Sequence, residues 1–207
     1  MDATQRCVET ALFGKGDWVI RDSGIFVDEF LDWGSPSNQN QKRSLGNNEW
    51  KVLQGGGMVE GVLWGGCLEV IEGIKNTELF PTTEFFENKI LFLEVSEWMP
   101  GVEWVEMFVR NLCVSGIACK LKALLFGRPH TFGSQVYNKQ YEEALVRVLG
   151  EEFGLENLLV VSRMDFGHTK PSCVLPIGGR VIVDSEKNNL RFSAKKCHRL
   201  GECIINI

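Results

Sequence analysis

Three short apolar runs, separated by segments of helical periodicity, constrain the fold of this chain more than any other feature. The runs lie at residues 90–95, 121–126 and 158–161. Near-continuous apolar runs of this length are typical of strands that are buried on both faces. Apolar residues also recur at helical spacing over 105–112 and over 141–149. Strand–helix–strand–helix–strand at this spacing predicts two crossover units, three parallel strands and a mixed α/β fold.

The segments on either side of this parallel unit indicate further strands. Residues 58–64 can form a strand that ends at a pair of glycines. Near the C-terminus, short apolar runs at 174–177, 180–184 and 190–192 are separated by glycine or asparagine turns. This spacing is typical of hairpins, so antiparallel strands are expected to complete the parallel βαβαβ unit.

The start of the chain has a different composition. It contains a polar run at 35–44 and a triple glycine at 55–57, which are typical of exposed loops or linkers. The triple glycine is not a phosphate-binding loop, since it precedes a strand and lacks the required lysine. The predicted organisation is a linker and lead-in segment over 1–57, an α/β domain over 58–195 and an unassigned tail over 196–207.

Composition excludes several classes of protein. The 207 residues include 22 basic and 27 acidic side chains, for a net charge of −5, which argues against a nucleic-acid partner. No run reaches the roughly 20 apolar residues that span a bilayer, and the N-terminus is not that of a signal peptide. The seven cysteines are scattered without a Cys-x-x-Cys pair, so neither a zinc site nor a disulfide framework is expected. We predict a cytoplasmic protein without membrane contact, metal or cofactor.

Acidic and imidazole side chains follow two of the predicted parallel strands. Glu94 and Glu97 lie at or just beyond the end of the first, and Asp165 and His168 lie just beyond the third. Functional groups gather at the carboxyl edge of such sheets. A carboxylate that pairs with an imidazole fixes its tautomer and stabilises its charged form, as a nucleophile requires of its base. The alternative, solvated loop acids and a turn histidine, is not excluded by spacing.

The chain offers no clear nucleophile for this pair. No Gly-x-Ser-x-Gly elbow occurs in the sequence. Cys67 follows two glycines at a strand end and Cys173 lies near His168, but a packing role is the favoured interpretation for each. The sequence therefore contains a base and its orienting acid without the group that they would serve.

Five motifs occur in the order found in a known family. They are Trp64-Gly-Gly-Cys67-Leu68, Lys89-Ile-Leu-Phe-Leu-Glu94-Val-Ser-Glu97, Phe126-Gly-Arg-Pro129, Asp165-Phe-Gly-His168-Thr-Lys-Pro171 and Leu175-Pro-Ile-Gly178. Together they resemble the LD-carboxypeptidase family of serine peptidases, which includes the microcin C self-immunity peptidases. The resemblance covers about residues 10 to 190, and the Gly-Arg-Pro and Phe-Gly-His-Thr-x-Pro motifs are closer to the immunity branch.

The resemblance implies a fold and two catalytic roles. Family members have an N-terminal domain with the nucleophilic serine and oxyanion hole, followed by a swivelling β/β/α domain. This chain is similar to the linker and the C-terminal domain, so the N-terminal nucleophile domain is expected to be missing. Glu94 and His168 would be the acid and base of a Ser-His-Glu triad, with Glu97 as the lesser alternative for the acid.

The resemblance and the strand ends together indicate further site residues. The candidates for substrate contact are Gly65, Gly66, Cys67, Glu97 and Arg128, with ordinary loop roles as the alternative. Cys67 stands where the family usually has asparagine. His130, close to Arg128, is a weaker candidate.

Two functional hypotheses follow from the resemblance. In the first, the chain is the C-terminal half of a serine carboxypeptidase that cleaves L,D-peptide bonds of muropeptides or microcin C-like peptidyl-nucleotide amides. Its partners would be the N-terminal nucleophile domain and a peptide or aminoacyl-amide substrate, and it would be inactive alone. In the alternative, it is a catalytically inactive truncated fragment that acts only as a binding or interaction module. Either form could be a homodimer.

Overall fold

The computed structural model of the chain describes residues 3–29, 31–32, 34–38, 46–47, 49–130 and 136–193. The predicted tail 196–207 and Trp33 lie outside these residues. The helices are α1 (Ala3–Phe13), η1 (Pro36–Asn38), α2 (Leu68–Ile74), η2 (Thr83–Phe86), α3 (Val102–Val114), η3 (Ala118–Lys120), α4 (Val136–Val146) and the π-helical η4 (Arg147–Glu152). The strands are β1 (Trp18–Arg21), β2 (Ile25–Phe26), β3 (Gly46–Asn47), β4 (Lys51–Gln54), β5 (Met58–Cys67), β6 (Lys89–Glu94), β7 (Ala123–Gly127), β8 (Leu159–Met164), β9 (Arg180–Asp184) and β10 (Asn189–Phe192).

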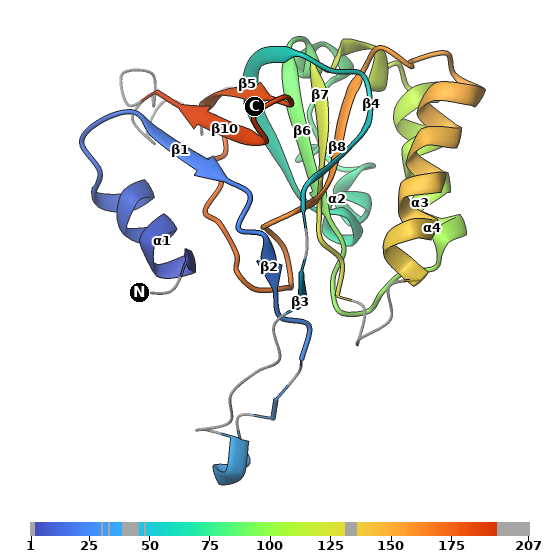
Figure 1. The fold of residues 1–207 in the computed structure, drawn as a ribbon. Helices are drawn as coiled ribbons and strands as arrows, with labels where there is room; N and C mark the ends of the chain where they lie inside the picture. The colour runs from blue at the N-terminus through green and yellow to red at the C-terminus, as the bar shows by residue number, and fades with distance from the viewer. Residues whose placement is uncertain are drawn as a thin grey trace.

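A mixed eight-stranded sheet organises the domain (Figure 1). Its strands lie in the order β1-β10-β9-β5-β6-β7-β8-β4. Strands β5 to β8 are parallel, whereas β9, β10 and β1 on one side and β4 on the other each pair antiparallel with their neighbour. The predicted mixed α/β fold is confirmed. The parallel part has one more strand than predicted, because β5 pairs with β6 through a crossover that includes α2.

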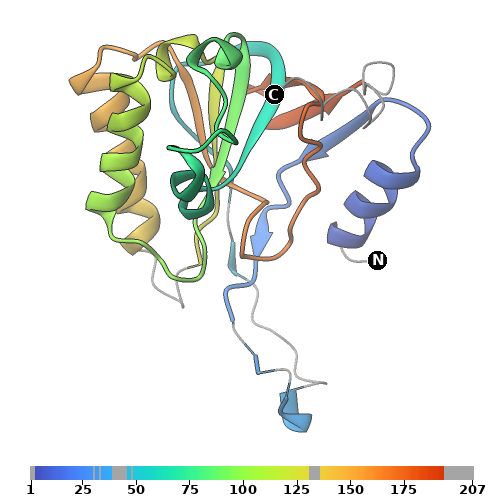
Figure 2. The same ribbon diagram turned by 180° about the vertical axis from the view of Figure 1, so that it is seen from behind.

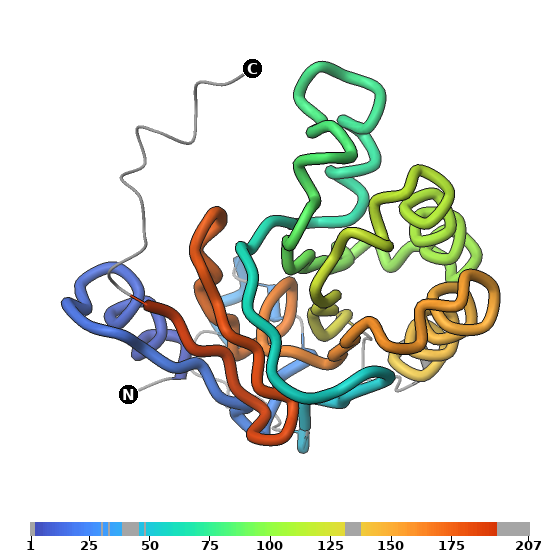
Figure 3. The backbone as a smooth tube through the Cα atoms, turned by 90° about the horizontal axis from the view of Figure 1, so that it is seen from above, coloured from blue at the N-terminus to red at the C-terminus, as the bar shows by residue number. Residues whose placement is uncertain are grey.

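The alternation of side chains along β6 explains why this sheet is covered on both faces. Ile90 and Phe92 belong to one buried cluster, and Leu91 and Leu93 belong to the other, since successive residues of a strand point to opposite faces. Helices α2, α3 and α4 pack on the Leu91 side (Figures 1 and 2). Helix α1 lies at the opposite side of the molecule from the α3–α4 pair (Figure 3).

The first 57 residues supply both edge strands of the main sheet. In β1, Trp18 pairs with Phe192, and in β4, Lys51 pairs with Ser162. The boundary that composition predicts at residue 57 therefore does not divide the sheet. Each of these strands has only four residues, most of which are partly or fully exposed. Their apolar pattern is therefore too short to be recognised in the sequence of a polar segment.

Most of the predicted elements outside the lead-in are confirmed. The helical patterns at 105–112 and 141–149 fall in α3 and in α4 with η4, and the runs at 180–184 and 190–192 form the β9–β10 hairpin. The run at 174–177 is not a strand, so that prediction was wrong. This segment has no strand pairing, and Pro176 within it has no N–H to donate to a ladder.

The carboxyl ends of β5 to β8 face the lower end of the molecule in Figure 1, where the short β2–β3 sheet also lies. Val27, just after β2, bridges to Lys170 through N–H···O distances of 2.8 and 3.3 Å. The lead-in therefore reaches the edge of the sheet that carries the predicted site. Within the described residues, no helix has the length and apolar character needed to cross a membrane.

Candidate active site

The close pairing of β5 with β6 places Glu94 at the edge of the sheet. Cys67, the last residue of β5, is in register with Glu94, the last residue of β6. A Cβ at Gly65 would lie 1.8 Å from the carbonyl oxygen of Phe92, so a side chain at this position would push the two strands apart. Glycine at this position allows the two strand ends to meet at the same level.

Glu94 forms a hydrogen-bonded pair with His168 across 74 residues of sequence. The Nδ1 atom of His168 lies 2.6 Å from Oε2 of Glu94. The Glu94 side chain is 12% exposed and that of His168 is 38% exposed, so the pair is shielded on the carboxylate side and open on the imidazole side. A carboxylate on Nδ1 holds the imidazole in one orientation and leaves Nε2 as the atom that can accept a proton.

In this structure Nε2 also has a carboxylate partner. Oε2 of Glu97 lies 3.0 Å from Nε2 of His168, and the Glu97 side chain is 62% exposed. The structure therefore brings together three of the residues predicted for the site, with the more buried Glu94 on Nδ1 of His168 and the exposed Glu97 on Nε2.

Gly167 gives the histidine loop the shape that this contact requires. Its φ of +99° is in a region that residues with a side chain rarely adopt. A Cβ at this position would lie 3.0 Å from Cβ and 3.1 Å from Oε2 of Glu94. The glycine of the Phe-Gly-His motif thus lets the backbone pass directly beside the carboxylate that His168 contacts.

Gly66 and Cys67, which we call the Gly66–Cys67 elbow, differ from Gly65 in their surroundings. A Cβ on Gly66 would meet no atom within 4 Å, so space is open beside it. The Cys67 thiol donates to Oε2 of Glu69 at 3.2 Å, and burial raises its pKa to about 11. Cys67 is therefore a thiol rather than a thiolate near neutral pH, which disfavours a nucleophilic role.

Glu69 connects this elbow with the loop that carries Glu97. Its Oε1 accepts hydrogen bonds from the Ser96 amide at 3.0 Å and the Ser96 hydroxyl at 2.6 Å. Burial alone would raise the pKa of Glu69, but the hydrogen bonds from Ser96 outweigh it and the pKa is lowered. Glu69 is thus an ionised anchor between the ends of β5 and β6.

Arg128 and Asp165 are buried in the interior beneath the loop that carries His168. Arg128 Nη2 forms an ion pair with Asp165 Oδ1, and the two side chains are 1% and 0% exposed. Asp165 therefore contacts Arg128, whereas the two carboxylates in contact with His168 are those of Glu94 and Glu97. The guanidinium of Arg128 has internal partners, and the substrate contact expected of it stays a prediction.

Two contacts at this edge were not predicted from the sequence. Trp50 is buried and its indole N–H donates to Oδ2 of Asp165 at 3.2 Å. His130 is also buried, and its Nδ1 lies 3.2 Å from Oδ1 of Asp28. Both contacts join the lead-in to loops at the carboxyl edge. In the sequence, only the Gly-Arg-Pro-His and Asn-Glu-Trp motifs mark these positions.

In the part of the chain that the structure describes, no group of three or more His, Cys, Asp or Glu side chains is arranged to hold a metal ion. The side chains that this edge brings together are the imidazole of His168, the largely buried carboxylate of Glu94 and the exposed carboxylate of Glu97. Groups of this kind can carry out acid–base catalysis.

Comparison with known proteins identifies relatives of about twice this length. The chain is 27% identical over 181 residues to the microcin C7 self-immunity protein MccF of Escherichia coli, which covers 84% of this chain and 50% of that protein. It is also 27% identical over 194 residues to the putative carboxypeptidase YocD of Bacillus subtilis, covering 93% of this chain and 55% of that protein. The chain thus spans about half the length of these curated relatives.

Solved structures agree with this comparison. An MccF-like protein from Streptococcus pneumoniae in complex with AMP superposes with a TM-score of 0.80 at 27% identity, over 93% of this chain and 58% of that one. MccF in complex with glutamyl sulfamoyl guanosine superposes with a TM-score of 0.76 at 25% identity, over 91% of this chain and 54% of that one. Residues 60–183 match the model of the LD-carboxypeptidase C-terminal domain, and the chain belongs to that family.

Proposed function

We propose that this chain supplies the general base and its orienting acid to a serine-type amide hydrolase. The observation that carries the proposal is the 2.6 Å contact between His168 Nδ1 and Glu94 Oε2 at the carboxyl edge of the parallel sheet. Membership of the LD-carboxypeptidase C-terminal domain family supports hydrolysis as the chemistry. The coverage of about half of the curated relatives supports a second, serine-bearing domain as the partner.

In the proposed reaction, His168 Nε2 removes the proton from a serine hydroxyl that the partner domain presents. The serine oxygen attacks the amide carbonyl, and His168 then gives the proton to the leaving amine. Glu94 accepts a hydrogen bond from Nδ1–H throughout and stabilises the imidazolium that forms. Glu97 must leave Nε2 before the serine can approach, and its exposed side chain has room to do so.

The proposed substrates contain an amide beside a free carboxylate. L,D-peptide bonds of muropeptides are one class, and microcin C-like peptidyl-nucleotide amides are the other. The solved relatives in complex with AMP and with glutamyl sulfamoyl guanosine support the nucleotide class. The open space beside Gly66 is where a substrate group could approach the end of β5.

The test is reconstitution of a two-domain enzyme. The serine-bearing N-terminal half of MccF is fused to residue 1 of this chain, and hydrolysis of an L,D-tetrapeptide and of aspartyl sulfamoyl adenosine is followed by mass spectrometry. We expect turnover by the fusion, no turnover by the chain alone, and a loss of about 10³-fold or more in His168→Ala. Glu94→Gln is expected to lose about 10²–10⁴-fold in kcat because the imidazole loses its orienting charge.

Three outcomes would contradict the proposal. Turnover by the fusion that His168→Ala leaves unchanged would exclude the base. Turnover by the chain alone that is abolished by Cys67→Ala or Cys173→Ala would indicate a cysteine hydrolase. Substrate binding by a folded fusion without any turnover, unaffected by Glu94→Gln, would favour a binding module without chemistry.

A further inference from the structure

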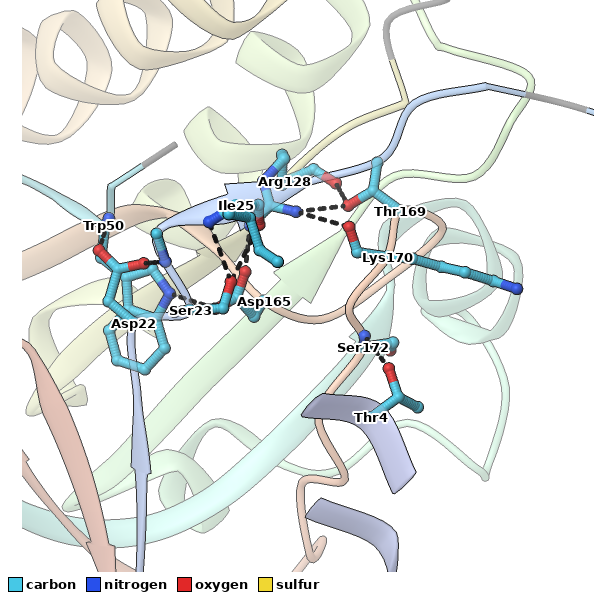
Figure 4. A network of polar contacts seen from close by, with 11 residues as sticks. Thr4, Asp22, Ser23, Ile25, Trp50, Arg128, Asp165, Thr169, Lys170 and Ser172 are labelled. Carbon is cyan, nitrogen blue, oxygen red and sulfur yellow. Dashed lines mark hydrogen bonds and ion pairs between the residues drawn. The ribbon is translucent and has the colours of Figure 1, made fainter. Parts of the chain in front are cut away.

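One arginine side chain holds both flanks of the loop that carries His168 (Figure 4). Arg128 Nη2 pairs with Asp165, three residues before the histidine. Arg128 Nη1 donates to Thr169 Oγ1 at 3.2 Å and to the Lys170 carbonyl at 3.5 Å, just after the histidine. Because a guanidinium is planar and rigid, these contacts fix the distance between the two ends of the loop.

Backbone hydrogen bonds also hold the two flanks of this loop. The Arg128 amide donates to the Met164 carbonyl at 2.9 Å, and the Asp165 carbonyl accepts from the Cys173 amide at 2.7 Å. His168 is therefore carried on a short arch whose two bases are fixed to the end of β7. At the top of the arch, His168 contacts Glu94, and the Gly167 backbone passes close beside the same carboxylate.

The second oxygen of Asp165 is held by the lead-in. Asp165 Oδ2 accepts hydrogen bonds from the Ser23 amide at 2.9 Å and from the Trp50 indole at 3.2 Å. Asp22 in turn accepts from the Trp50 amide at 2.7 Å, so the segments around residues 22 and 50 are tied to each other as well. Both oxygens of this carboxylate are thus occupied, each from a different part of the chain (Figure 4).

Such a pair is not explained by stability alone. Transfer of both charges out of water is unfavourable, and apolar residues of similar size often serve as well or better for stability. What a buried, hydrogen-bonded pair supplies that apolar packing does not is a defined direction for each of its contacts. Around His168, the contacts that need direction are those that place its ring against Glu94.

We propose that Arg128 and Asp165 are positioning residues for His168, and that Trp50 completes this role from the lead-in. The inference rests on the proposed function, in which the orientation of the His168 ring matters for proton transfer. None of the three touches the imidazole. They hold the arch so that Nδ1 stays on Glu94 and Nε2 faces the open side.

The test measures the His168 ring directly in the full chain. Ring ¹⁵N chemical shifts of histidine-labelled protein report the tautomer and the Nδ1–H hydrogen bond, and His168→Ala assigns the signals among the three histidines. Arg128→Lys keeps the charge but removes the fork. Trp50→Phe keeps the apolar ring but removes the indole N–H from Asp165.

We expect both variants to shift the His168 signals toward a mixture of tautomers, with the larger change in Arg128→Lys. In the fused hydrolase, Arg128→Lys should lower kcat by about 10²-fold with little change in KM, since misplacement of about 1 Å has effects of that size. Two matched controls should leave both readouts unchanged. Arg110→Lys alters a fork that binds Glu152 away from the loop, and Trp18→Phe removes an indole N–H without a hydrogen-bond partner in the described structure.

The possible failures are distinguishable. If the wild-type ring shows the Nδ1 hydrogen bond and both variants retain it at full occupancy, Arg128, Asp165 and Trp50 are structural only and the inference is overturned while the proposed function stands. If the wild-type ring shows no such bond, the inference and the proposed function both fail. If Arg128→Lys does not fold, Trp50→Phe decides the outcome, because it leaves the buried ion pair intact.

Discussion

His168 and Asp165 lie three residues apart on one loop, yet they take part in two ion pairs of very different kind. His168 contacts Glu94, and its side chain is 38% exposed. Asp165 pairs with Arg128 in the interior, where both side chains are at most 1% exposed. The comparison teaches that one loop can hold one side chain open to an approaching group and another closed off among fixed partners.

The largest expected effect lies at the buried pair. Arg128→Ala leaves the Asp165 carboxylate without its charged partner, so the free energy of unfolding should fall by about 3–5 kcal/mol. Urea unfolding followed by circular dichroism measures this. The matched variant at the open pair, His168→Ala, should lose less than about 1 kcal/mol. Equal losses in the two variants would remove the distinction between them.

The group of contacts around Glu142 should contribute to the free energy of unfolding by an amount between those of these two pairs. Lys51 donates to it at 2.7 Å, Ser162 at 3.0 Å, and Arg163 through its fork. Burial alone would raise the pKa of Glu142, but the hydrogen bonds from Arg163 and Lys51 outweigh it, and the pKa is lowered. Glu142→Gln should therefore lower the free energy of unfolding by about 1.5–3 kcal/mol at pH 7.

The pH dependence of this effect has a definite sign. Because the folded protein lowers the pKa of Glu142, its contribution is complete above the ordinary value of 4.5 and is lost as the pH falls through the folded value. The difference in unfolding free energy between wild type and Glu142→Gln should thus shrink in acid. Glu152→Gln, at an exposed pair with Arg110, serves as the control and should show a smaller effect. A difference that stays constant down to pH 3 would contradict the assignment.

The two carboxylates on His168 provide a finer comparison. Glu97 is 62% exposed, so Glu97→Gln should change the free energy of unfolding by less than about 0.5 kcal/mol. It should also leave the Nδ1 hydrogen bond to Glu94 intact in the ring ¹⁵N shifts. Glu94→Gln should weaken that bond. A loss of the Nδ1 bond in Glu97→Gln would instead make Glu97 the orienting acid.

Thiol reactivity provides a further comparison, between the cysteines Cys7 and Cys67, that does not depend on a change in stability. The Cys173 thiol donates to Cys7, and with the Val174 amide at 3.2 Å it lowers the pKa of Cys7 to about 6. Burial raises the pKa of Cys67 to about 11. At pH 7 iodoacetamide should therefore modify Cys7 well before Cys67, as measured by peptide mass spectrometry. Cys173→Ala should slow the modification of Cys7, and an unchanged rate would contradict the role of that hydrogen bond.

The parallel unit could be predicted because its signal is local. The apolar run at 90–93 marks a strand buried on both faces, and the periodicity of 105–112 marks the helix that covers it. The edge strands β1 and β4 could not be predicted, because four partly buried residues carry too short a pattern. Their place in the sheet depends on partners in β10 and β8 that are far away in sequence.

The site follows the same division. Sequence alone determined that carboxylates and an imidazole end two parallel strands, because motif order and strand position are properties of the chain. Only the tertiary structure decided that Glu94 lies on Nδ1 of His168 and Glu97 on Nε2, since the register of β5 with β6 and the passage at Gly167 bring Glu94 to Nδ1. It also decided that Asp165 and Arg128 face inward. A buried charge and a solvated one are the same letter in a sequence, and only the packing around them sets their solvation and their partners.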